Sequence, residues 1–199
     1  KMDELDDVLF FSIKSILQEE ESSVVRVEQI SFLLKDNLLV SFQEKKSDFF
    51  THIRERIKTH SGIVRKKKSD YLLYLLLDAV MENFFITIES YENGIEALLV
   101  EAKNSYKSVF LENIEKEREN LNFLKRSIVP LRDALFNLKT HQNDEGFGSI
   151  EKSNYAFFER LHQKSLELLE QIDYDLKSLD SASNVFFSSQ SQRMNQIMK

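Results

Sequence analysis

Polar side chains recur at regular spacing near the C-terminal end of this sequence. Steps of three or four positions place them on one face of a predicted helix, here named the polar stripe. Its members are Lys177, Ser181, Asn184, Ser188, Ser191, Asn195 and Met198. Hydroxyl and amide groups hydrogen-bond water without adding charge, whereas a merely solvated face usually carries Glu and Lys. The stripe is therefore a candidate site, and the alternative is the polar surface of a helix.

Acidic residues form a second candidate group. Their positions are Glu82, Glu89, Glu92, Glu96, Glu101, Glu112, Glu115, Glu117 and Glu119. The net charge of −6, from 27 basic and 33 acidic residues, is compatible with attracting cations and argues against nucleic-acid binding. Two interpretations stay open for these acids, a solvated helix face and a surface that concentrates cations.

Motifs for catalysis are missing from the sequence. Its four glycines form no phosphate-binding loop or dinucleotide fingerprint, and no serine sits in a nucleophile motif. The histidines at 52, 60, 141 and 162 are scattered, and His52 and His60 are either solvated or, less simply, zinc ligands. The basic run at 65–68 is either a solvated helix entry or a phosphate-binding patch. We therefore expect no enzyme.

Composition indicates a soluble globular chain of one or two domains. The sequence has 199 residues, of which 42% are hydrophobic and 30% charged. Because it has no cysteine, we expect a cytosolic environment. We find no run of about 18 apolar residues, and so we predict no membrane span. The chain begins with Lys1 and ends in a helical pattern, from which we expect a fragment of a longer protein.

Alternating apolar and polar residues predict three strands, at 8–17, 24–34 and 38–42. A loop at 18–23 separates the first two, and Lys35, Asp36 and Asn37 give a turn signal before the third. Three strands alone make a marginal sheet. Helices, or strands upstream of Lys1, must therefore cover this meander.

Apolar residues at helical spacing predict one short and two long helices. The short helix starts at Ser47 or Asp48 and ends near His60, and the first long one starts at Ser69 or Asp70. The two long helices repeat apolar residues about every seven positions, which is typical of antiparallel packed helices. Pro130 lies inside the second, where we expect a kink or an unpaired carbonyl.

The remaining segment, 148–199, has no proline and no glycine after Gly148, which predicts a very long stalk helix. The fold class is then α+β, a small mixed α/β head with a β-meander followed by three long α-helices. We expect a partial N-terminal α/β domain at 1–66 and a long-helix domain at 67–199.

Several blocks of sequence are hard to explain by packing alone. They are Glu28-Gln29-Ile30-Ser31, Phe42-Gln43-Glu44, Arg54-Glu55-Arg56-Ile57, Gly62-Ile63-Val64-Arg65-Lys66-Lys67, Asp70-Tyr71-Leu72-Leu73-Tyr74, Leu77-Asp78-Ala79, Pro130-Leu131-Arg132, Ser188-Ser189 and Asn195-Gln196-Ile197-Met198-Lys199. In this order and spacing the chain resembles the CorA-type magnesium and cobalt transport proteins. The resemblance covers nearly the whole chain, and its specific parts are the blocks at 70–78 and 195–199.

The resemblance implies the cytoplasmic regulatory domain of a homopentameric, magnesium-gated cation channel at the bacterial inner membrane. Segment 148–199 would be the stalk that leads into the first pore-lining membrane helix. The membrane helices, the Gly-Met-Asn selectivity motif and the basic C-terminal tail of the family would follow the chain. Magnesium, with cobalt or another divalent ion as alternative, would act as a weak regulatory ligand.

The resemblance also gives the polar stripe a cause. Five copies of this helix around one axis would place Asn184, Ser188, Ser191, Asn195 and Met198 toward a central water column. Small uncharged oxygens can bond the water shell of an ion without trapping it. Since Mg²⁺ gives up its waters reluctantly, passage in hydrated form is expected.

The sequence departs from the family at two regulatory positions. The resemblance implies a metal-binding acid at the position of Asn184, and a stalk acid paired with Asp78 at the position of Arg160. Asp78 itself is kept, and Asp180 lies one turn before Asn184 on nearly the same face. We expect weak divalent-ion binding at acidic positions such as Asp78 and Asp180.

Two alternatives stay open. A zinc transporter of the same superfamily would keep the fold and change the ion. A soluble coiled-coil scaffold or interaction protein would explain the heptad-like repeats, but not the block at 70–78.

Overall fold

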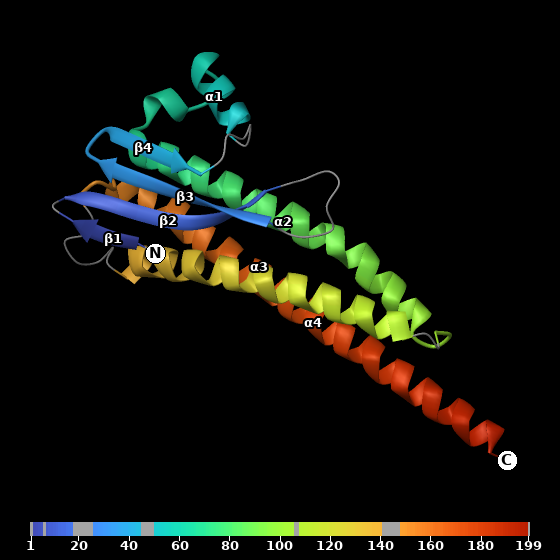
Figure 1. Cartoon of the computed structure of the whole chain (residues 1–199). Helices are drawn as coiled ribbons and strands as arrows, with labels where there is room; N and C mark the ends of the chain where they lie inside the picture. Colours follow the sequence, from blue (N-terminus) through green and yellow to red (C-terminus); the bar gives the residue numbers. More distant parts are fainter. Residues whose placement is uncertain are drawn as a thin grey trace. The chain divides into compact units, whose positions relative to one another are not determined.

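The computed structural model of the chain describes residues 2–5, 7–17, 26–44, 50–105, 108–140 and 148–198. The elements follow in the order β1 (Met2–Leu5), β2 (Val8–Leu17), β3 (Arg26–Lys35), β4 (Leu38–Gln43), α1 (Thr51–Lys58), η1 (Val64–Lys66), α2 (Ser69–Glu101), α3 (Ser108–Thr140), η3 (Lys152–Asn154) and α4 (Tyr155–Ile197). The strands come first and the long helices follow (Figure 1), so the α+β fold class is confirmed.

The strands form one antiparallel sheet in the order β1-β2-β3-β4. Cross-strand pairs between β2 and β3 set Leu9 opposite Leu34, Phe11 opposite Phe32 and Ile13 opposite Ile30, and all six side chains are buried. Because strand side chains alternate in direction, this register gives one face of the sheet a continuous apolar surface. The face that carries Lys14 is more exposed.

Local turn chemistry explains the ends of the strands. Asp36 has φ +49° in the turn between β3 and β4, a conformation that Asp tolerates better than most residues. The turn and three strands expected from sequence are present, with β3 described from Arg26 onward. The predicted loop at 18–23 and the predicted caps at 47 and 48 lie outside the described residues. β1 is an additional strand that the sequence pattern did not predict.

The short helix α1 stops before the position we expected. His60, with φ +56°, and Gly62, with φ +74°, turn the chain directly after Lys58. Phe50 and Ile53 are buried, and the Phe50 ring meets the Phe32 ring edge-on at 6.4 Å. The Phe50 ring therefore fixes the start of α1 to strand β3.

The helices α2 and α3 each have 33 residues, and α4 has 43. The start of α2 at Ser69 matches the predicted start. The helix α3 passes through Pro130 without ending there. The predicted stalk helix is present, but it begins at Tyr155 after a short 3₁₀ turn at Lys152–Asn154 rather than at 148.

By packing, the chain divides into two compact units. Unit 1 comprises Lys1–Phe84 and Ser127–Glu167, and unit 2 comprises Phe85–Arg126 and Leu168–Lys199. The core of unit 1 combines the apolar face of the sheet with buried helix residues such as Leu77 and Leu161, and Asn83 of α2 donates a hydrogen bond to the Ile16 carbonyl of β2. In unit 2 the rings of Phe110 and Phe186 stack at 5.0 Å.

One helix passes a test for membrane spans by length and composition. Helix α2 contains an 18-residue window of mean hydropathy 1.5, although it is not an uninterrupted apolar run. However, 67% of that window is buried within the structure, as in the core helix of a soluble protein. Among the described residues this one helix is weak evidence for a membrane span.

Candidate functional site

All members of the polar stripe are exposed in the structure. Six lie on α4 and Met198 follows the helix directly, all within unit 2. The helix buries a different set of side chains, among them Leu179, Ala182 and Phe186. At 3.6 residues per turn the stripe and this buried face lie on roughly opposite sides of the helix. The polar surface is therefore the side of α4 that unit 2 leaves uncovered.

Serine hydroxyls on α4 are partly satisfied by the helix itself. Ser181 donates to the Lys177 carbonyl at 3.0 Å, and Ser178 donates to the Tyr174 carbonyl at 3.1 Å. Such bonds occupy the hydroxyl hydrogen and leave the oxygen free to accept from water.

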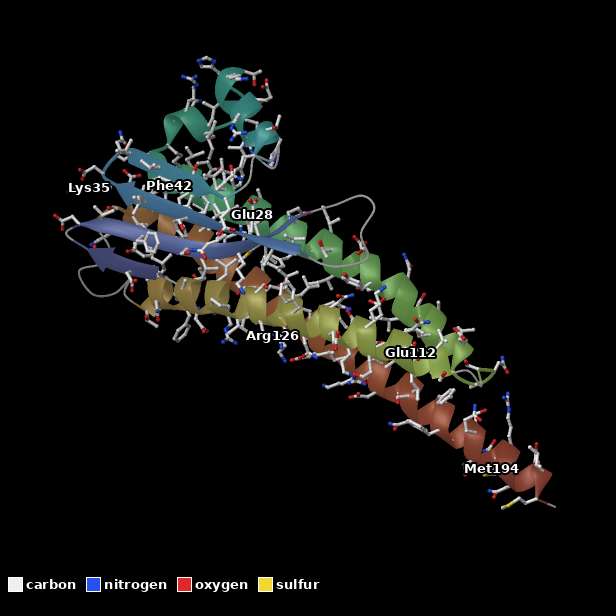
Figure 2. All side chains as sticks on the ribbon, in the orientation of Figure 1. Glu28, Lys35, Phe42, Glu112, Arg126 and Met194 are labelled. Atoms are coloured by element: carbon white, nitrogen blue, oxygen red, sulfur yellow. The ribbon has the colours of Figure 1, made fainter. Side chains whose placement is uncertain are left out.

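Close to the end of the helix, Met194 projects away from the ribbon with 61% exposure (Figure 2).

The face of α4 away from the stripe is tied to the turn that follows α2. Ser189 donates to the Lys103 carbonyl at 2.8 Å, and Gln190 donates to the Ser105 carbonyl at 3.1 Å. Arg193 also reaches the Lys103 carbonyl, at 3.5 Å. Neighbouring residues in one sequence block thus differ in role, because Ser188 faces outward and Ser189 holds the turn. Sequence reasoning grouped the two serines and missed this division.

Asp78, the first of the two predicted metal ligands, is engaged in an ion pair. The Lys164 ammonium donates to Asp78 Oδ1 at 2.6 Å within unit 1, and about a third of each side chain is exposed. Burial alone would lower the pKa of Lys164, but the hydrogen bond and charge of Asp78 outweigh it and raise that pKa. Arg160 is also close, since it and Asp78 both act on the pKa of Tyr74.

Asp180, the second predicted metal ligand, also carries a protein cation. Arg118 of α3 donates to Asp180 Oδ1 at 2.6 Å, and it contacts Glu115 at 3.3 Å. The hydrogen bond to Asp180 is the main cause that raises the Arg118 pKa. Two turns before Asp180 on α4, Asp173 pairs with Lys125 at 2.5 Å. Both ion pairs belong to unit 2, and they join α3 to α4.

Other candidate residues are used within the protein. Within the described ranges, no group of three or more His, Asp or Glu side chains is placed to hold a metal ion. His52 and His60 are exposed, and the His162 pKa is lowered by burial and then by Lys139. In the basic run, Arg65 donates to the Ile57 carbonyl and Lys68 pairs with Glu151 at 2.8 Å.

A buried network at the start of α2 was not predicted. Asp70, which is 1% exposed, accepts from the Tyr71 amide at 2.8 Å, the Glu151 amide at 2.9 Å and the Asn154 side chain at 2.8 Å. Asn154 in turn accepts from Lys67 at 3.2 Å. The network thereby connects the first turn of α2 with the segment that enters α4, inside unit 1. The network gives Asp70 a structural role, as the acceptor that holds these two segments together.

An antiparallel sheet followed by long helices is also the fold of solved domains from cation transport proteins. The complete structure of the CorA magnesium transporter from Methanocaldococcus jannaschii matches 100% of this chain with a TM-score of 0.84 and 24% identity, over 61% of its own length. The ZntB cytoplasmic domain from Vibrio parahaemolyticus matches 96% with a TM-score of 0.76 and 20% identity, over 73% of its length. These identities show the fold alone.

The chain belongs to the CorA-like Mg²⁺ transporter protein family, whose model matches residues 1–199. A curated relative, the cobalt/magnesium transport protein CorA from Thermotoga maritima, is 28% identical over 199 residues. That match covers 100% of this chain and 56% of the relative, so the chain spans about half the length of the relative. The resemblance seen in the sequence is thus confirmed, and the family is one of transporters.

Proposed function

We propose that this chain is the cytoplasmic, funnel-forming and ion-sensing part of a CorA-type channel for divalent cations, with magnesium or cobalt as the ion. The exposed polar stripe on α4 carries the proposal. A helix that buries one side and presents hydroxyl and amide groups on the other can line a water-filled path. Family membership supports the class of ion, since the relative from Thermotoga maritima is a cobalt/magnesium transport protein.

Assembly is the second part of the proposal. A single helix cannot enclose water, so several copies of α4 must meet around an axis. We propose a homopentamer in the full-length protein, anchored in a bacterial inner membrane by helices beyond this chain. The ion-facing residues are then Asn184, Ser188, Ser191, Asn195 and Met198. The four Asn and Ser side chains contact a hydrated ion through uncharged oxygens, whereas Met198 presents a thioether sulfur.

Ion sensing is the third part of the proposal, and we expect Asp78 and Asp180 to bind divalent ions with low affinity. Each carboxylate already accepts from a protein cation at 2.6 Å. A divalent ion has to displace Lys164 or Arg118, or share the carboxylate with it. Asn184 and Arg160 supply no carboxylate at the positions where the family resemblance implies one. We therefore propose feeble, regulatory binding rather than a tight metal site.

Ion flux through the full-length protein tests the proposal. The protein is reconstituted in liposomes that contain a magnesium-sensitive dye, and influx is compared for Asn195→Leu and Gln196→Leu. Both changes replace an exposed amide with leucine, but only Asn195 lies on the polar stripe. We expect Asn195→Leu to slow the influx at least several-fold and Gln196→Leu to leave it nearly unchanged. Equal effects would contradict an ion path along the stripe.

Zinc is the second candidate ion. We retain it because the chain shares its fold with the ZntB cytoplasmic domain. Since the fold does not distinguish the two ions, influx is measured again in liposomes that contain a zinc-sensitive dye. Influx of zinc without influx of magnesium or cobalt would change the proposed ion and leave the proposed path intact.

A further inference from the structure

Asp175 stands out among the acids of unit 2 because it is buried without a counter-charge. Its side chain is on α4, in the sequence Asp173-Tyr174-Asp175, and the residue is only 3% exposed. Gln171, one turn earlier, donates its amide to Asp175 Oδ1 at 3.1 Å. The second oxygen, Oδ2, is buried and has no hydrogen-bond partner. Buried polar atoms in proteins nearly always have one, so this oxygen needs an explanation.

The surroundings of Asp175 add negative charge rather than remove it. Burial raises the pKa of Asp175, and the Glu92 carboxylate on α2 raises it further. The hydrogen bond from Gln171, on the same helix, lowers the Asp175 pKa. Among the described residues, no charged group of α3 shifts this pKa. The nearby cations of α3 are committed elsewhere, Lys125 to Asp173 and Arg118 to Asp180. The charged group that acts on the Asp175 carboxyl is therefore another carboxylate, Glu92, and no protein cation is among its causes of shift.

We propose that Asp175 and Glu92 together bind a hydrated divalent cation between α2 and α4 of unit 2. Asp175 supplies the free Oδ2 from the buried side, and exposed Glu92 supplies a carboxylate from the solvent side. Magnesium-sized ions are commonly held by one or two carboxylates and keep several waters. A bridging water alone would satisfy Oδ2 as a hydrogen-bond acceptor, but it would leave two negative charges opposed.

The site lies outside the proposed ion path. Asp175 belongs to the side of α4 that carries buried Leu179 and Phe186, away from the polar stripe. It also differs from Asp78 and Asp180, which each have a protein cation. A cation at Asp175 would join α2 to α4 within unit 2, whether or not the longer protein transports ions.

Thermal unfolding of the 199-residue chain at neutral pH tests the proposal, with increasing MgCl₂ and with NaCl of matched ionic strength. Binding to the folded state predicts a saturable rise of the midpoint temperature, with about a tenfold shift of the folding equilibrium at ten times the dissociation constant. We expect Asp175→Asn to lose this rise and Glu92→Gln to need higher magnesium. Asp173→Asn, two residues away on the same helix, should keep it. Asp78→Asn and Asp180→Asn should keep it too, which separates this site from the weak ones.

A direct probe covers the case in which a variant folds poorly. Mn²⁺ added to the unsubstituted chain should selectively broaden the NMR amide signals of residues around Glu92, Gln171 and Asp175. Absence of this local broadening, or an equal magnesium response in the parent chain and Asp175→Asn, would overturn the proposal. The site would then be a protonated buried acid. Neither experiment measures transport, so the flux assay can fail while this site stands.

Discussion

Lys164 and Asp78, 86 positions apart in the chain, form an ion pair of 2.6 Å inside unit 1. The pair joins α4 to α2, and about a third of each side chain is exposed, so solvent screens it only in part. Lys164 therefore supplies the counter-charge of the Asp78 carboxylate.

Replacement of Lys164 by methionine should weaken the fold. The change keeps a long aliphatic side chain but leaves Asp78 without its donor, and we expect the free energy of unfolding to fall by about 1 kcal/mol. Urea denaturation measures this difference. Magnesium should then stabilise the variant more than the parent chain, because Asp78 is free to bind it. Lys139→Met, which removes a more exposed pair with Glu159, is the control and should have little effect. Equal losses in both variants would show that the Asp78 pair contributes nothing special.

Replacement of Asp70 by alanine should be much more damaging. Three donors point at this buried carboxylate, and the change removes the acceptor of the Glu151 amide and of the Asn154 side chain. The Tyr71 amide keeps only its longer bond to the Lys68 carbonyl, at 3.2 Å. We expect a loss of about 3 kcal/mol or more in the free energy of unfolding, from the same denaturation experiment. Asp133→Ala is the matched control, because its pair with Arg132 is exposed and should contribute less than about 1 kcal/mol.

Asp175 should make stability depend on pH in a direction opposite to a paired acid. Burial, and then Glu92, raises the Asp175 pKa in the folded state above its ordinary 3.8. Between the unfolded and folded pKa values the folded chain binds more protons, so this residue lowers stability as the pH rises. In metal-free buffer Asp175→Asn should therefore be more stable than the parent at neutral pH. The difference should vanish below the unfolded pKa, and urea denaturation across the pH range measures it. A variant that is less stable at neutral pH would contradict the raised pKa.

Cysteine cross-linking can test the orientation of α4 in the full-length protein, because this chain has no cysteine of its own. If the polar stripe faces an axis shared by several copies, Ser188→Cys should give covalent dimers under mild oxidation. Gln196→Cys, also exposed but on another side of the helix, should give few. Gel electrophoresis without reductant reads the result. Dimers from Gln196→Cys alone would mean that a different face of α4 lies between the copies.

Patterns within short stretches of sequence predicted most of the fold. Alternation in β2 is unambiguous because Leu9, Phe11 and Ile13 all point into the core, and the turn at Asp36 needs only its own residue type. By contrast, β1 has four residues, two of them acidic, so it offers no alternating pattern to detect. The apolar window of α2 is not an uninterrupted apolar run, because a few polar residues lie within it.

Only the part of the candidate site that lies on a single helix, the polar stripe, could be predicted from the sequence. The spacing of the polar stripe determines a shared face, and the structure leaves that face exposed. The partners of Asp78 and Asp180 lie 86 and 62 positions away along the chain. These ion pairs depend on how the helices pack, so no local sequence pattern predicts them. The same holds for Asp175, whose isolation becomes visible only when the neighbouring helices are in place.

The hydrogen bonds that tie α4 to the turn after α2 end on main-chain oxygens of Lys103 and Ser105. Side chains in that turn can therefore change without loss of the attachment, because every residue offers the same carbonyl. A rotation of α4 by a single residue, about 100°, would carry Ser189, Gln190 and Arg193 out of reach together. These hydrogen bonds thus fix the rotation of α4 about its own axis, and with it the direction in which the exposed face of the helix points.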